Sequence, residues 1–214
     1  YLDGMALYEA FANGILNLAK HQSTLDEINV YPVPDGDTGT NMVFTLMPIV
    51  EECAEQINSN AGETYAIMAN MALDSARGNS GTIIAQWFYG MSQASKGLDK
   101  VSPKDFAKAL INGHNSARDS LSNPEEGTII TVMREVANEA ENLINNGCDE
   151  YYTFVREIYK KAEISLKETK HTLKILTKSD VVDAGALGYV LIIQGMLNIL
   201  EKSDGGRIQT THLD

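Results

Sequence analysis

Apolar residues recur at three- and four-residue steps along most of this chain, and this period constrains the fold more than any other feature of the sequence. Leu7, Phe11, Ile15 and Leu18 form the first such series. The step is the period of an α-helix with one buried face, whereas the alternation typical of a half-buried strand is found nowhere. We therefore predict eight helices, over residues 2–20, 39–58, 63–76, 80–95, 103–120, 128–146, 150–169 and 184–202.

The connections between these segments are short, which favours antiparallel neighbours. The sequence thus predicts an all-α fold, an eight-helix antiparallel up-and-down bundle or closed barrel. A chain of 214 residues can bury one sizeable core, so we expect a single helical domain over 1–202. We interpret the polar, Gly-containing stretch 203–214 as a linker stub that leads to further domains absent from this segment.

The charge balance limits the partners that such a domain can have. A formal net charge of −12 argues against nucleic acid or an anionic membrane, because both favour a basic surface. No apolar run reaches transmembrane length, since the richest one, 184–200, is interrupted by three glycines. Cys53 and Cys148 are the only thiols, which indicates a reducing compartment and hence the cytoplasm.

Four loops are expected at one end of the bundle, because every second helix of an antiparallel series begins at the same end. Each of these loops is rich in Gly and small polar residues, and the loops at the opposite end are less so. The four comprise residues 34–41, 77–82, 125–128 and 183–188. We therefore expect a cavity between them at one chemically distinct rim.

Asp35 and Asp37 flank a glycine just before the second long helix, so both carboxylates can turn toward one point. Closely spaced oxygen ligands suit Mg²⁺, which takes a few carboxylates together with waters and phosphates. The alternative is local, with Asp37 or Thr38 as a helix cap and Asp35 in a turn. Asn29 and Asn41 add more polar groups to this region than capping requires, which favours the metal site.

The loop over residues 78–81 has the composition of a phosphate cradle. Glycine lets a phosphate approach the backbone, and a helix N-terminus supplies free N–H groups and a favourable dipole. The loop is not a P-loop, because no lysine follows it. Alternatively, Ser80 only caps its helix, and Arg77 either reaches a phosphate or covers an apolar edge with its stem.

The last two rim loops hold Thr128 and Asp183, which could contact the same ligand. Metal-binding carboxylates and phosphate-compatible helix ends at one rim together predict the binding of a Mg-nucleotide. The residues by themselves specify no phosphoryl acceptor.

At residues 29–42 the chain resembles the signature of the ATP-binding (DhaL-like) domain of bacterial fatty acid kinase. That domain is related to the nucleotide-binding subunit of dihydroxyacetone kinase. The resemblance continues through residues 76–81, 126–129 and 181–185, so four ordered motifs span nearly the whole chain.

The resemblance implies a barrel of eight antiparallel helices with ATP and two Mg²⁺ ions at one rim. It implies that Asp35 and Asp37 are the catalytic metal ligands, with Asn29 on or near a third. The nucleotide-binding positions that it implies are Thr38, Gly39, Asn41, Arg77, Asn79, Ser80, Gly81, Thr128, Asp183 and Gly185.

One departure separates the two branches of this family. The dihydroxyacetone branch carries an Asp five positions before its first motif carboxylate and a His directly after the motif, where this chain has Val30 and Thr38. These substitutions favour the fatty acid branch, and they leave the identity of the third metal ligand open.

In the fatty acid branch the acceptor is a fatty acid held by a separate fatty-acid-binding (DegV-like) protein, and the product is an acyl phosphate for phospholipid metabolism. A carboxylate is already ionised at neutral pH and needs no general base, which fits the absence of an obvious catalytic His. The full-length subunit is expected to form a homodimer through domains absent here. Two alternatives stay open: a dihydroxyacetone kinase nucleotide subunit, and a non-catalytic Mg-nucleotide-binding regulatory module.

Overall fold

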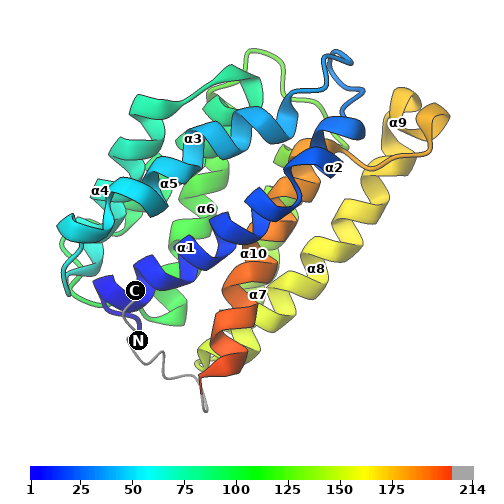
Figure 1. Cartoon of the computed structure of the whole chain (residues 1–214). Helices are drawn as coiled ribbons and strands as arrows, with labels where there is room; N and C mark the ends of the chain where they lie inside the picture. The colour runs from blue at the N-terminus through cyan, green and yellow to red at the C-terminus, as the bar shows by residue number, and fades with distance from the viewer. Residues whose placement is uncertain (204–214) are drawn as a thin grey trace.

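The computed structural model describes residues 1–203, which fold into ten α-helices and one 3-10 turn (Figure 1). The eight long helices are α1 (Gly4–Lys20), α3 (Thr38–Glu52), α4 (Ala61–Ser75), α5 (Gly78–Ala94), α6 (Pro103–Asp119), α7 (Ile129–Asn145), α8 (Tyr151–Thr172) and α10 (Ala184–Lys202). Within the described residues there is no strand, and a single isolated bridge joins Leu2 to Val101. The prediction of an all-α fold is confirmed.

Two short helices were not predicted, so the expected number of eight is wrong for the described part of the chain. They are α2 (Gln22–Glu27) and α9 (Lys174–Ser179), and each has six residues. A helix needs 3.6 residues for one turn, so six residues complete fewer than two turns and reveal no period in the sequence. Both lie at the end of the molecule that carries the predicted rim loops (Figure 1).

The second long helix is shorter than its apolar period predicts. The prediction extended it to residue 58, whereas α3 ends at Glu52 and the 3-10 turn η1 (Ala54–Gln56) follows. At residue 58, the predicted end, the Asn58 side chain accepts a hydrogen bond from the backbone N–H of Asn60 at 2.7 Å, which forms a turn there instead of a helix. This local turn competes with the helix for the backbone.

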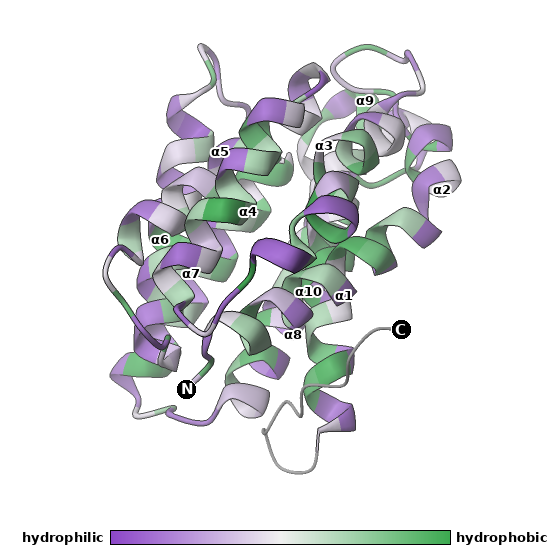
Figure 2. Cartoon of the chain, turned by 60° about the vertical axis from the view of Figure 1, so that its left-hand side comes forward, coloured by the Kyte–Doolittle hydropathy of each residue, from purple (hydrophilic) through white to green (hydrophobic). Residues whose placement is uncertain are grey.

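The long helices form an antiparallel ring (Figure 1). From α4 to α8 each helix packs against the next one, α8 packs against α10, and α10 packs against α1. The ring closes through α3. The remaining helix, α3, lies against α1, α4 and α5. Apolar residues face the interior and polar residues the outside (Figure 2), so the helical period has buried one face of each helix.

Phe11 on α1 lies at the centre of an aromatic cluster in the core. Its ring centroid is 5.2–6.3 Å from those of Tyr65, Trp87, Phe88 and Phe106, which belong to α4, α5 and α6. All five side chains are buried. Aromatic pairs of this kind stabilise a core beyond the apolar area that they bury, so the cluster fixes α5 firmly against its neighbours.

The last helix, α10, is the most apolar of the described helices. By length and composition it could cross a membrane, but 72% of its apolar window is buried within the fold. Its apolar surface is therefore accounted for by packing against the other helices.

Of the linker stub predicted over 203–214, only Ser203 belongs to the described residues, so that prediction stays a prediction.

Candidate functional site

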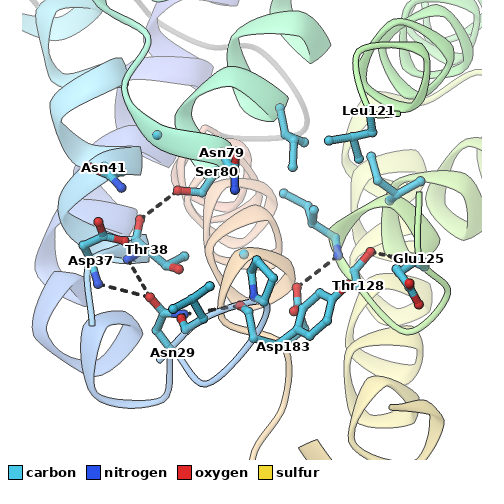
Figure 3. A pocket seen from close by; sticks show the side chains of 18 of the residues that line it. Asn29, Asp37, Thr38, Asn41, Asn79, Ser80, Leu121, Glu125, Thr128 and Asp183 are labelled. Atoms are coloured by element: carbon cyan, nitrogen blue, oxygen red, sulfur yellow. Dashed lines mark hydrogen bonds between the residues drawn. The ribbon is translucent and has the colours of Figure 1, made fainter. Parts of the chain in front are cut away.

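The four predicted rim loops meet around one cavity of about 440 Å³ (Figure 3). It lies where α3, α5, α7 and α10 begin, at one end of the ring. Small-molecule sites in proteins have volumes of roughly 300–1,000 Å³. Ten of the predicted site residues line the cavity: Asn29, Asp35, Asp37, Thr38, Asn41, Asn79, Ser80, Thr128, Asp183 and Gly185.

The carboxylates of Asp35 and Asp37 make no hydrogen bond or ion pair with any described residue. Asp37 occupies the N-cap position of α3, where an Asp side chain ordinarily accepts a bond from its own helix. It makes no such bond here, and Thr38 is already inside the helix. The local alternative, in which Asp37 or Thr38 merely caps the helix, is therefore wrong.

Asn29, which is 4% exposed, bonds the backbone where α3 begins. Its Oδ1 accepts hydrogen bonds from the backbone N–H groups of Asp37 and Thr38, at 3.1 and 3.2 Å (Figure 3). Both lone pairs of the amide oxygen are thus engaged. The prediction that Asn29 is the third metal ligand does not fit this geometry, because no lone pair is left for a cation.

No third acidic, His or Cys side chain joins Asp35 and Asp37 closely enough to complete a metal site within residues 1–203. Two carboxylates are nevertheless a common protein contribution to a Mg²⁺ site, whose other ligands are waters and substrate phosphates. The donor set therefore fits magnesium bound together with a phosphate ligand.

The N-terminus of α5 forms the opposite wall of the cavity. No side chain caps this helix, so the N–H groups of its first turn are not satisfied by a capping residue. Gly78 has a φ of 66°, and a Cβ there would lie 2.4 Å from Asn41 Nδ2, so only glycine fits. Ser80 lies in the first turn and donates from Oγ to the backbone oxygen of Thr38 at 3.3 Å. Ser80 thus joins α5 to α3, and the alternative in which it caps its own helix is wrong.

Asp183 is a buried clamp between two helix N-termini. Its Oδ2 accepts hydrogen bonds from the backbone N–H of Ile129 on α7 and of Ala186 on α10, both at 3.0 Å. Its own N–H donates to Thr169 Oγ1 at 3.0 Å. Burial raises the pKa of the Asp183 carboxyl from 3.8 to about 6, although the two N–H groups favour the charged form. The sequence predicted a ligand contact here, but this clamping role was missed.

Three predicted nucleotide-binding residues do not line the cavity. Gly39 packs against α2, since a Cβ there would lie 2.3 Å from the backbone oxygen of Gln22. A Cβ at Gly81 would likewise lie 2.3 Å from Thr45 Oγ1. Arg77 is exposed, and its guanidinium lies over the ring of Phe44, 5.0 Å from the centroid. The glycines are required for close helix packing, and Arg77 covers an apolar side chain, which is one of the two roles considered for it.

Two features of the site were not predicted from the sequence. Asp26 on α2 accepts hydrogen bonds from Thr40 through both carboxylate oxygens, at 2.9 and 2.7 Å, and so fastens the first turn of α3. One wall of the cavity is apolar and consists of Tyr31, Pro32, Val33, Ile83, Leu121, Ile129 and Ile130. The contact of Asp26 with Thr40 depends on a reversal of the chain that no local sequence pattern predicts. Several of the apolar residues, in contrast, adjoin the predicted rim loops, and this position in the sequence could have indicated them.

The cavity carries negative charge without a compensating cation. Asp35, Asp37, Glu125 and Asp183 line it, and among the residues that the structure describes no Lys or Arg does. The pKa of Tyr31 is raised by burial and by the charges of Glu125 and Asp183, which agrees with this negative potential. A phosphate ligand therefore needs a bound cation between itself and the carboxylates.

The sequence matches the model of one protein family, the DAK2 domain, over residues 32–198. An uncharacterized protein of Staphylococcus saprophyticus is 35% identical over 200 residues, which are 94% of this chain and 36% of that protein. Protein YloV of Bacillus subtilis is 34% identical over the same length, with the same two coverages. The chain thus spans about a third of the length of these relatives.

The fold is shared with solved structures of the dihydroxyacetone kinase from C. freundii. The complex of that enzyme with AMP-PNP and Mg²⁺ matches with a TM-score of 0.67 and 15% identity, over 89% of this chain and 33% of the other. The native form matches with a TM-score of 0.69 and 15% identity, over 92% and 35%. At this identity the likeness concerns the helical architecture.

Proposed function

Because this chain belongs to the DAK2 domain family, we propose that it is the ATP-binding kinase domain of a fatty acid kinase. In the proposed reaction, a separate fatty-acid-binding (DegV-like) protein presents the fatty acid. An oxygen of its carboxylate forms a bond to the γ-phosphorus of ATP while the bond from that phosphorus to the bridging oxygen breaks. The products are ADP and an acyl phosphate, which would serve phospholipid metabolism.

The observation that carries the proposal is the pair of unengaged carboxylates beside a cavity without cationic side chains. Asp35 and Asp37 would hold two Mg²⁺ ions, which when bound supply the positive charge that the phosphates need. Free N–H groups at the start of α5, with Asn79 and Ser80, are suited to the phosphate oxygens. The apolar wall of the cavity would take the base.

The acceptor is inferred from what the cavity offers for proton transfer. Dihydroxyacetone presents hydroxyl groups, which gain reactivity when a base removes a proton, whereas a carboxylate is already ionised. No His lines the cavity in the described part of the chain, and Thr38 stands directly after the two carboxylates. Catalysis by this domain would rest on positioning and on charge neutralisation, which agrees with a carboxylate acceptor.

A nucleotide subunit of dihydroxyacetone kinase is the second candidate, favoured by the shared fold and by the AMP-PNP and Mg²⁺ of the C. freundii complex. A non-catalytic Mg-nucleotide-binding module is the third, and the same cavity would serve it.

The proposal extends to the whole subunit. Residues 1–202 would be the kinase domain and 203–214 a linker to further domains, through which the full-length protein would form a homodimer. We place it in the cytoplasm, and the free state of Cys53 and Cys148 agrees with a reducing compartment.

The three candidates are distinguished by adding the acceptor to the full-length subunit with Mg-ATP. With the acyl-loaded partner protein we expect acyl phosphate, trapped as a hydroxamate, and we expect none from free fatty acid. Turnover of dihydroxyacetone in the presence of a sugar-binding subunit would instead select the second candidate. Nucleotide binding without either product would select the third.

A further inference from the structure

We propose that Asn29 is a positioning residue, whose amide holds the loop 29–38 closed against the start of α3 and so places the Asp35 and Asp37 carboxylates for a cation. The inference rests on the proposed metal site at Asp35 and Asp37. It replaces the role of third metal ligand that the family resemblance implied for Asn29 or a neighbouring position.

The first support is that every hydrogen-bonding group of the Asn29 amide is used within the loop. Oδ1 accepts from the N–H groups of Asp37 and Thr38, and Nδ2 donates to the backbone oxygens of Tyr31 and Val33 at 3.3 and 3.2 Å (Figure 3). One buried amide therefore connects the start of the loop, its middle and the first turn of α3. The path of the chain through Asp35 is fixed between these points.

The second support is that the Asp37 side chain does not bond its own helix, although Asp37 occupies the N-cap position of α3. Asp is among the preferred N-cap residues, so an Asp at this position ordinarily turns its carboxylate back toward its own helix. In this structure the Asp37 carboxylate makes no capping bond, and the N–H of Thr40, at the third position of the helix, is bonded by Asp26 at 2.9 Å instead. Asn29 bonds the two N–H groups that precede these positions, those of Asp37 and Thr38. Asn29 and Asp26 together therefore bond the start of α3 without the Asp37 carboxylate, which stays available for a cation.

The third support is that the loop requires an amide rather than a carboxylate at residue 29. An Asp could still accept from Asp37 and Thr38, but it has no donor for the oxygens of Tyr31 and Val33, and would repel them. It would also add a negative charge beside the two metal-binding carboxylates. A metal ligand at this position predicts the opposite, because a carboxylate binds Mg²⁺ better than an amide does.

The substitution Asn29→Asp therefore separates the two roles. We would titrate the protein with Mn²⁺ in the presence of ADP and measure free Mn²⁺ by electron paramagnetic resonance, for wild type, Asn29→Asp and Asn29→Ala. Residues that orient metal ligands typically change metal affinity by 10–100-fold, so we expect about tenfold or greater weakening in both variants. A ligand role predicts equal or tighter binding by Asn29→Asp.

Asn17→Ala is the matched control. Asn17 is a half-buried Asn that, like Asn29, holds a helix in place. Its Nδ2 donates to the oxygen of Leu191 at 2.7 Å and to Gln194 Oε1 at 3.1 Å, but it does not line the cavity. This variant should lose thermal stability and keep the wild-type Mn²⁺ affinity. Equal weakening in Asn17→Ala and Asn29→Ala would mean that general destabilisation, not loop closure, causes the effect.

Wild-type protein supplies a test that does not depend on the folding of the variants. In the metal-free protein the amide hydrogens of Asp37 and Thr38 should be protected from exchange, because they donate to Asn29. Rapid exchange of both would overturn the inference, and so would undiminished Mn²⁺ binding by Asn29→Asp. If wild type binds no Mn²⁺, the metal site fails and the proposed function fails with it, whereas the other two results refute only the role of Asn29.

Discussion

Replacing Asp183 by Asn should raise the stability of the domain relative to wild type, by more at pH 7.5 than at pH 5. The Asp183 carboxyl has a pKa of about 6 in the folded protein against an ordinary value of 3.8. Because the folded pKa is the higher one, the stability contributed by protonated Asp183 is complete below pH 3.8 and is lost as the pH rises through about 6. The Asn side chain does not ionise, so the stability of the variant does not fall with pH for this reason.

The two pKa values set the size of the effect. A difference of one between the folded and unfolded pKa corresponds to about 1.36 kcal/mol, so the full loss is about 3 kcal/mol at pH 7.5. At pH 5 wild type has lost about half of it, which leaves a difference of about 1–2 kcal/mol between the two conditions. An Asn oxygen can still accept from Ile129 and Ala186, so the clamp itself should persist.

The assay is urea unfolding of wild type and Asp183→Asn at both pH values. The difference in the free energy of unfolding between the two proteins should grow by about 1–2 kcal/mol from pH 5 to pH 7.5. Asp183→Ala, which removes the acceptor of two backbone N–H groups, should be less stable than Asp183→Asn at both. A difference between wild type and Asp183→Asn that does not change with pH would refute the reasoning.

The remaining predictions concern the cavity walls. Asp35→Ala and Asp37→Ala should each abolish Mg-dependent ADP binding and leave the far-UV circular dichroism unchanged, because neither carboxylate holds the fold together; loss of helical signal in either variant would contradict this. Gly78→Ala should cost roughly 1–3 kcal/mol of stability and weaken ADP binding, since its Cβ would collide with Asn41 at a positive φ. Gly97→Ala is the control, because Gly97 also has a positive φ, 77°, but has nothing within 4 Å, so a smaller loss without an effect on ADP is expected.

The long helices and the composition of the rim could be predicted from the sequence. A period of three and four residues over fifteen or more positions identifies a helix wherever the fold buries one of its faces, as for α1 and α7. Because successive helices alternate in direction, the four Gly-rich loops can be placed at one end of the bundle before the packing is known. The two six-residue helices show no period, and their positions depend on contacts such as that of Asp26 with Thr40.

The roles of individual residues within the site could not be predicted from the sequence in this way. That Asp35 and Asp37 line the cavity could be predicted, because both belong to a rim loop and lie two residues apart. Asp183 contacts Ile129, which is 54 residues away, so its role as a clamp depends on the tertiary fold. Gly81 belongs to a loop with the composition of a phosphate cradle, but its lack of a side chain serves the approach of α5 to Thr45. Composition alone does not distinguish a glycine that admits a ligand from one that admits a neighbouring helix.

The central claim is that this cavity binds a nucleotide only together with magnesium. It is tested most directly by calorimetric titration of the domain with ADP, once with Mg²⁺ and once with excess chelator. Because carboxylates line the cavity and, among the described residues, no Lys or Arg does, we predict saturable binding of one ADP per chain with Mg²⁺ and none without it. Equal affinity in the presence of chelator, or no binding of ADP under either condition, would contradict the claim.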